Sequence, residues 1–260
     1  MLVCGAGYNK LSYHHEKGKN YRLFFAVNML CMLLTYFPTV MSRYAVAASY
    51  GGLFIALFPK LKRNRKFIFT LIIGIMIVFP MLNAFRYASI SDVDVGSALE
   101  QSFSNLPFIW QHGDFDAYTL LLMSLEHTEK LGSTHGWQLF NSLMFWWPRV
   151  LWPKWLPEKT RGSGDYLART RGMSFTNLSC PLPAEGNINF GIIGVVAFGL
   201  VFGAIVGAID RCYWKNPENT YFSVIYPTLM FMFFFMSRGD LMLPLAYTIS
   251  FVAVRKLLVI

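Results

Sequence analysis

Long apolar segments alternate with polar ones along this chain of 260 residues. A helix needs about 20 mostly apolar residues to cross a bilayer, and six segments come close to that length. In one of them, Gly199, Gly203 and Gly207 recur at every fourth residue, which predicts the close approach of another helix. The pattern predicts an all-α fold, a polytopic transmembrane helix bundle with about six spans. The spans lie at residues 23–40, 45–58, 67–85, 191–209, 221–236 and 241–254.

A long polar and aromatic segment separates the two groups of spans. It divides the chain into a three-span block at 1–86, a large loop at 87–190 and a second three-span block at 191–260. Because tryptophan favours the membrane interface, we expect the loop to form short helices that lie on or dip into the membrane surface. The tryptophans concerned are Trp137, Trp146, Trp147, Trp152 and Trp155.

Composition agrees with a membrane protein, and charge orients the spans. Hydrophobic residues make up 55% of the chain and charged residues 14%, which is not the composition of a soluble domain. If the spans alternate in direction, 13 of the 23 basic residues fall on one face of the membrane, and the other face holds 11 of the 14 carboxylates. Basic residues in short loops mark the cytoplasmic side. We therefore expect both termini in the cytoplasm, the loop at 87–190 outside, and no nucleic-acid partner.

Three arginines stand at the outer ends of separate predicted spans: Arg43, Arg86 and Arg238. A guanidinium group offers a planar fork of donors that suits phosphate. The alternative interpretation is that each arginine merely extends its charged end to the interface. Three in one layer favour a site for a lipid-linked pyrophosphate.

Three further residues outside the spans are candidates for a general base. His112 stands beside Asp114 and Asp116, and such a cluster can tune an imidazole or a carboxylate for proton transfer. Glu185 precedes the fourth predicted span, where the N-terminal end of a helix favours an anion. Glu185 is therefore interpreted either as a simple helix-start carboxylate or as a base at the mouth of the bundle.

Five short motifs occur in a characteristic order between residues 30 and 245. They are Phe37-Pro38-Thr39-Val40-Met41-Ser42-Arg43-Tyr44, the span end from Pro80 to Arg86, Phe115-Asp116, Leu151-Trp152-Pro153-Lys154, and Glu185 followed by Asn189-Phe190-Gly191. Through these motifs the chain resembles the bacterial O-antigen polymerase (Wzy) family, which polymerises oligosaccharide repeat units.

The resemblance implies an integral protein of the bacterial inner membrane with a helix bundle like that of the C-type glycosyltransferases. The large loop would face the periplasm. Its implied activity is a glycosyltransferase reaction in which a growing glycan moves from undecaprenyl pyrophosphate to another lipid-linked repeat unit. The product would be O-antigen or a related surface polysaccharide. Family members usually have more spans, so the resemblance identifies this chain with their C-terminal portion.

The resemblance also implies partners and roles for individual residues. The partners are the lipid-linked oligosaccharide, membrane lipids, a chain-length regulator and a flippase. The three arginines would hold the pyrophosphate, and Glu185 would deprotonate the acceptor hydroxyl, with Asp116 or His112 as alternative bases. Asn189 and Lys154 stand in two of the matched motifs and are expected to bind substrate. Neither a metal nor a cofactor is expected, because arginines can supply the positive charge.

Two other functions stay open at the level of sequence. An O-antigen ligase would use the same donor but transfer the glycan to the lipid A core. A polysaccharide exporter or flippase component would transport the glycan without extending it. Ion-coupled carriers usually place ionisable residues at mid-membrane depth, and the predicted spans contain almost none, which disfavours the exporter.

Overall fold

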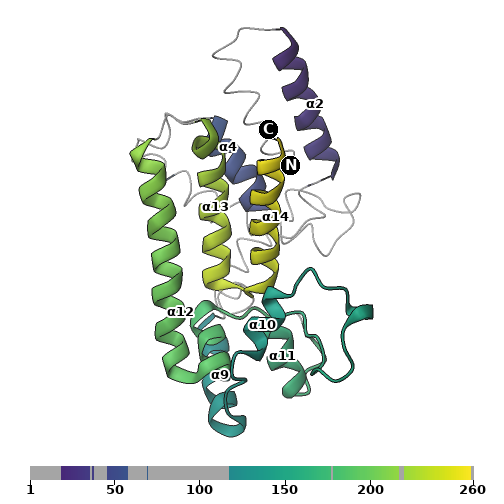
Figure 1. Cartoon of the computed structure of the whole chain (residues 1–260), viewed down its shortest axis with the longest axis vertical. Coiled ribbons are helices and arrows are strands. Elements are labelled where there is room, and N and C mark those ends of the chain that lie inside the picture. The colour runs from purple at the N-terminus through teal and green to yellow at the C-terminus, as the bar shows by residue number, and fades with distance from the viewer. Residues whose placement is uncertain are drawn as a thin grey trace, which may run out of the picture. The chain divides into compact units, whose positions relative to one another are not determined.

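The structure is a computed structural model that describes residues 19–35, 37, 46–57, 69, 117–176, 178–216 and 220–258. Every regular element in these ranges is helical, which confirms the all-α prediction (Figure 1). The elements are α2 (Lys19–Thr35), η1 (Ala47–Gly51, a π-helical turn), α4 (Gly52–Leu57), α9 (Ala117–Leu131), α10 (Trp137–Leu143), η5 (Arg149–Leu151, a 3-10 turn), α11 (Ser163–Thr170), α12 (Leu182–Lys215), α13 (Thr220–Arg238) and α14 (Met242–Leu258).

Of the described helices, α12 is the one long and apolar enough to cross a membrane. Only 6% of its most apolar stretch is buried among the described residues, whereas the core helix of a soluble protein is mostly buried. Large apolar side chains stand exposed along it, among them Ile192, Ile193, Val196, Leu200 and Val201. This agrees with a membrane protein. Helices also occur at the first, second, fifth and sixth predicted spans, and the number of spans stays a prediction.

The helix α12 bends sharply near its start. The backbone leaves the helical region at Phe190 (φ −140°, ψ 17°) and Gly191 (φ 66°, ψ −154°). Residues eight apart in a straight helix are separated by about 12 Å, yet a Cβ added to Gly186 would lie 2.5 Å from the carbonyl oxygen of Gly194. Residues 182–189 therefore fold back against the first turn of the apolar segment, and the two glycines permit this contact.

The regular glycines further along α12 show no close contact with another described helix. A Cβ added to Gly199 or Gly203 meets nothing within 4 Å among the described residues. At Gly207 the nearest atom is the Arg211 side chain, at 3.6 Å. The predicted helix contact is thus not seen there, and the close backbone approach lies at the bend instead.

The chain divides into two compact units. The first comprises Met1–Phe115 and Tyr213–Phe231. In it, α4 approaches α13 so closely that a Cβ on Gly52 would lie 2.2 Å from the Thr228 hydroxyl. Tyr213 and Tyr226 stack with ring centroids 4.0 Å apart.

The second unit comprises Asp116–Cys212 and Met232–Ile260. Its core is built on Cys180, Ala184 and Ile188, against which Leu121 of α9 and Tyr166 of α11 pack. Helices α9 and α11 contact each other, and α10 contacts α14. Short helices thus form within the predicted loop at 87–190, and they build one unit with the start of α12 and with α14. Their position at a membrane surface stays a prediction.

Candidate functional site

The second unit buries a carboxylate in the first turn of α12. Glu185 precedes the bend and has no exposed surface. Its Oε2 accepts a hydrogen bond of 2.5 Å from the Ser163 hydroxyl, and its Oε1 accepts one of 3.1 Å from the backbone N–H of Leu241. Glu185 therefore ties the start of α11 to the turn between α13 and α14.

A second carboxylate in that turn reaches the same end of α11. Asp240 accepts hydrogen bonds from the backbone N–H groups of Gly164, at 3.1 Å, and Met242, at 3.0 Å. A Cβ on Gly162 would lie 2.1 Å from both oxygens of this carboxylate, and Gly162 has a φ of +134°. Only glycine fits here, because it lacks the clashing atom and tolerates this backbone conformation.

The two carboxyls favour their protonated forms to different degrees. Burial raises the pKa of Glu185 to about 8, and the nearby Asp240 contributes to the rise, although bonds from Ser163 and Leu241 oppose it. Burial also raises the pKa of Asp240, to about 6. Asp240 therefore ionises first, and its charge helps to hold the proton on Glu185. Near neutral pH, the pair retains one proton.

Two neighbours of the pair have fixed charge states. Burial raises the pKa of the Cys180 thiol, and the charges of Glu185 and Asp240 raise it further, so this thiol stays protonated and unreactive. Burial also raises the pKa of Asp165, but hydrogen bonds from the Arg161 N–H and the Arg169 guanidinium outweigh burial and lower it. Asp165 is thus ionised and adds negative charge beside Asp240.

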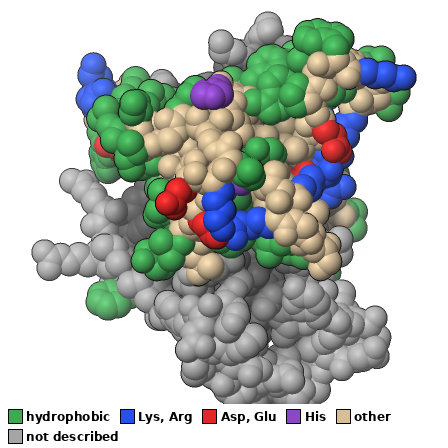
Figure 2. Space-filling view, turned by 90° about the horizontal axis from the view of Figure 1, so that it is seen from below, with side chains coloured by type: hydrophobic (Ala, Val, Ile, Leu, Met, Phe, Trp, Pro, Cys, Tyr) green, Lys and Arg blue, Asp and Glu red, His purple; other side chains and the backbone are tan. Residues whose placement is uncertain are grey.

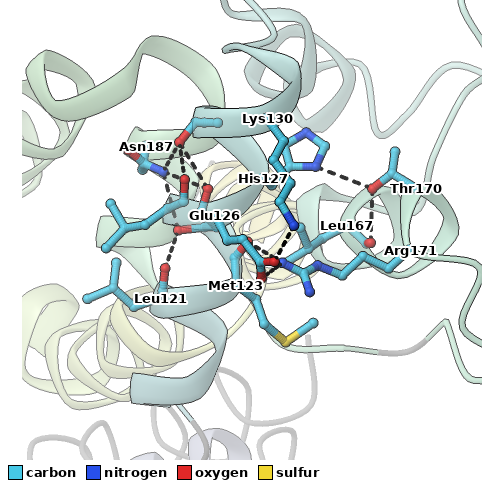
Figure 3. A network of polar contacts seen from close by, with 12 residues as sticks. Leu121, Met123, Glu126, His127, Lys130, Leu167, Thr170, Arg171 and Asn187 are labelled. Atoms are coloured by element: carbon cyan, nitrogen blue, oxygen red, sulfur yellow. Dashed lines mark hydrogen bonds and ion pairs between the residues drawn. The ribbon is translucent and has the colours of Figure 1, made fainter.

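A polar network holds the fold-back segment of α12 against α9 (Figure 3). The Asn187 amide donates to the Ser124 carbonyl at 2.9 Å and to the Thr128 hydroxyl at 2.8 Å. His127 lies one turn along α9, with its Nδ1 3.5 Å from the Thr170 hydroxyl of α11. Burial, followed by the charge of Arg171, lowers the pKa of His127, so the imidazole is neutral near neutral pH.

The charged side chains around this network neutralise one another. Glu126 accepts hydrogen bonds from Lys130 at 2.7 Å and from Arg171 at 2.6 Å, and these bonds lower its pKa to about 2. Arg169 pairs with Glu158 as well as with Asp165. Figure 2 shows basic and acidic side chains side by side on one face of the molecule.

The structure places four of the eight predicted site residues. Glu185 lies at the centre of the acid cluster, and Arg238 ends α13 two residues before Asp240. Asn189 is fully buried; its amide donates to the Glu185 carbonyl and accepts from the Leu139 N–H, so it positions α12 against α10. Lys154 is exposed, in the turn that follows η5. The other four lie outside the described residues: Arg43, Arg86, His112 and Asp116.

Sequence reasoning missed two members of the cluster, Ser163 and Asp240, as partners of Glu185. A serine after glycine, like an aspartate after a span end, is too common to signal a site. The one usable signal was Gly162, because glycine is the default residue where the backbone adopts a positive φ or another group approaches closely. Among the described residues, no three His, Cys, Asp or Glu side chains are grouped so that they could hold a metal ion.

Comparison with known proteins adds no relative. No protein-family model matches the chain, and neither a curated protein nor a solved structure matches it significantly.

Proposed function

We propose that the chain is a glycosyltransferase that polymerises lipid-linked oligosaccharide repeat units at a membrane surface. A hydroxyl of the acceptor glycan attacks the anomeric carbon of the donor. The new glycosidic bond forms as the bond from that carbon to the undecaprenyl pyrophosphate breaks, and the pyrophosphate leaves with the bonding electron pair. The proton of the acceptor hydroxyl passes to Glu185 in its ionised form, which is the minor form near neutral pH and in this step regains the proton that it favours.

The observation that carries this proposal is the buried Glu185 at the start of a membrane-length helix. A general base works best when its pKa lies near the working pH, and burial together with Asp240 brings the pKa of Glu185 to about 8. An ordinary helix-start carboxylate would be exposed and ionised. Perturbed carboxyls of this kind gather at functional sites.

The short turn between α13 and α14 contacts one of the two oxygens of Glu185. Leu241 donates its backbone N–H to Glu185, and Asp240 beside it contacts the start of α11. The proposal therefore requires substrate binding to displace this turn. Arg238 lies at the α13 end of the same turn, where its guanidinium can hold the leaving pyrophosphate. Arg43 and Arg86 complete that role in the proposal.

The test is the length of surface glycans in the native bacterium with its own gene deleted and then restored as a variant. Wild type should restore long chains on a polysaccharide gel, and Glu185→Gln should leave single repeats on the lipid A core. Glu129→Gln, an exposed carboxylate of α9, is the matched control. Immunoblots of the membrane fraction must show equal amounts of each protein.

Each alternative function has its own outcome in this experiment. A deletion strain that lacks all glycan on the core but accumulates lipid-linked polymer would identify a ligase. Lipid-linked units that remain on the cytoplasmic leaflet would identify a flippase or exporter component. Long chains made by Glu185→Gln at wild-type protein levels would refute the assignment of the base. Arg238→Lys should be as defective as Arg238→Ala if the planar fork matters.

A further inference from the structure

The segment between α10 and α11 displays large apolar side chains to the outside. We call residues 146–155 the tryptophan loop. In it, Val150 is 95% exposed and Trp155 81% exposed, and Leu151 and Trp146 are also exposed. Soluble surfaces rarely present so many large apolar groups together, and such patches mark sites of interaction with proteins or membranes.

The tryptophan loop is held in place from within. The Lys159 ammonium, itself buried, donates to the backbone carbonyls of Met144, at 2.6 Å, and Trp147. It also lies 5.1 Å from the centre of the Trp152 ring. The carbonyls of the turn are thus satisfied without an external partner, and burial lowers the pKa of Lys159, as expected for an internal cation.

The tryptophans of this region divide into two kinds. The indole N–H groups of Trp147 and Trp152 donate to the backbone carbonyls of Leu151, at 3.0 Å, and Pro157, at 2.9 Å. Trp152 also packs edge-on against Trp137, with ring centroids 6.2 Å apart. These two hydrogen bonds fix Trp147 and Trp152 to the loop backbone, whereas Trp146 and Trp155 are 60% and 81% exposed.

Charge indicates which surface the loop meets. The tryptophan loop contains two exposed cations, Arg149 and Lys154, and no acidic residue. Tryptophan beside basic residues is typical of the interface between hydrocarbon and anionic headgroups. The unit that contains the loop also contains the membrane-length helix α12, and α10, which leads into the loop, contacts the apolar helix α14.

We propose that the tryptophan loop docks into the headgroup region of an anionic bilayer. Val150 and Leu151 enter deepest, Trp146 and Trp155 lie at the boundary with the acyl chains, and Arg149 contacts lipid phosphate. An inserted apolar surface of this type reaches about 5–10 Å into that boundary. This inference is independent of the proposed glycan chemistry, because it concerns how the unit is anchored and involves no acid-cluster residue.

The test measures the depth of a nitroxide label in vesicles. The full chain, with its four cysteines replaced by alanine, receives one new cysteine through Val150→Cys, which suits a position with almost no internal contact. The matched control is Glu129→Cys on the exposed side of α9. Both proteins are reconstituted into vesicles of phosphatidylcholine mixed with phosphatidylglycerol, and collision rates with oxygen and with a water-soluble nickel chelate are read by electron paramagnetic resonance.

The label at position 150 should be several-fold less accessible to the nickel chelate than the control, with a depth of about 5–10 Å below the headgroups. Arg149→Gln, or vesicles of phosphatidylcholine alone, should make the label shallower. Equal nickel accessibility at the two positions would overturn the proposal. So would low accessibility to both oxygen and the nickel chelate, since a protein partner or a second copy, rather than acyl chains, would then cover the loop.

Discussion

Replacing Glu185 with glutamine tests the central claim about the carboxyl pair of Glu185 and Asp240, namely that Glu185 is protonated in the folded protein. Its pKa rises from an ordinary value of 4.5 to about 8 in the folded protein. Between these two pH values the folded state binds more protons than the unfolded state, so stability must fall as pH rises. Each pH unit in this window corresponds to about 1.4 kcal/mol.

The magnitude follows from the width of the window. From pH 4.5 to pH 7 the buried carboxyl removes about 3 kcal/mol from the free energy of unfolding, and by pH 8 about 4 kcal/mol. Glutamine has the same shape and cannot ionise. Its carbonyl can accept from Leu241, and the Ser163 hydroxyl can turn to accept from the amide. Glu185→Gln should therefore be about 3 kcal/mol more stable than wild type at pH 7 and equally stable near pH 4.5.

The assay is denaturant unfolding in detergent micelles, followed by tryptophan fluorescence, at several pH values from 4.5 to 8.5. Asp240 titrates in both proteins, so the difference between the two curves isolates Glu185. Glu129→Gln should follow wild type at every pH. If the difference between Glu185→Gln and wild type stays constant with pH, or if the variant is less stable at pH 7, the carboxyl is ionised in the fold and the reasoning fails.

Three further outcomes follow from the same unit. Ser163→Ala removes a hydrogen-bond donor that lowers the pKa of Glu185. The fall in stability with pH should therefore continue to a higher pH than in wild type, and the free energy of unfolding should be lower by about 1–3 kcal/mol. Ser163→Thr should restore both properties. Gly162→Ala clashes with the Asp240 carboxylate and should lower the thermal midpoint far more than Gly172→Ala, because Gly172 also has a positive φ but has nothing within 4 Å of an added Cβ. Gly186→Ala should disrupt the fold-back and reduce folded yield, whereas Gly199→Ala, with nothing within 4 Å, should leave it unchanged.

A stable but inactive Glu185→Gln would separate function from folding. Natural active sites often retain groups that reduce stability, because their chemistry requires them. Loss of glycan chains in a variant that unfolds at higher denaturant concentration cannot be attributed to misfolding. The stability assay and the glycan assay therefore use the same variant but test different claims. The first tests whether Glu185 is protonated in the folded protein, and the second tests whether it acts as the base.

Local pattern predicted the position of Glu185 but not its environment. Its place before an apolar segment predicted a carboxylate at the start of a helix, and it lies in the first turn of α12. The helix dipole gave no hint of burial, because the partners of this carboxylate come from elsewhere. Ser163 lies 22 residues away and Leu241 lies 56 residues away. Such contacts depend on tertiary packing, which no spacing in the sequence records.

The tryptophans of the loop illustrate the same limit of sequence-based prediction. The sequence predicted that tryptophans of the loop favour an interface, and it treated all of them alike. Their separation into hydrogen-bonded and exposed groups depends on Lys159, whose buried ammonium organises the turn. A lysine in a polar loop is ordinarily solvated, so nothing in its neighbours indicated this role. By contrast, the predicted start of the fourth span at residue 191 coincides with the bend in α12.

The bend in α12 also constrains the number of residues between Gly186 and Gly194. Gly186 and Gly194 meet across it, and each residue added to a helix turns what precedes it by about 100°. A single insertion between them would rotate Glu185 away from Ser163 even if every side chain were kept. Substitutions on the outer surface of the bend leave this register intact. The spacing of eight residues is thus itself a structural constraint, as strict as the identity of the glycines.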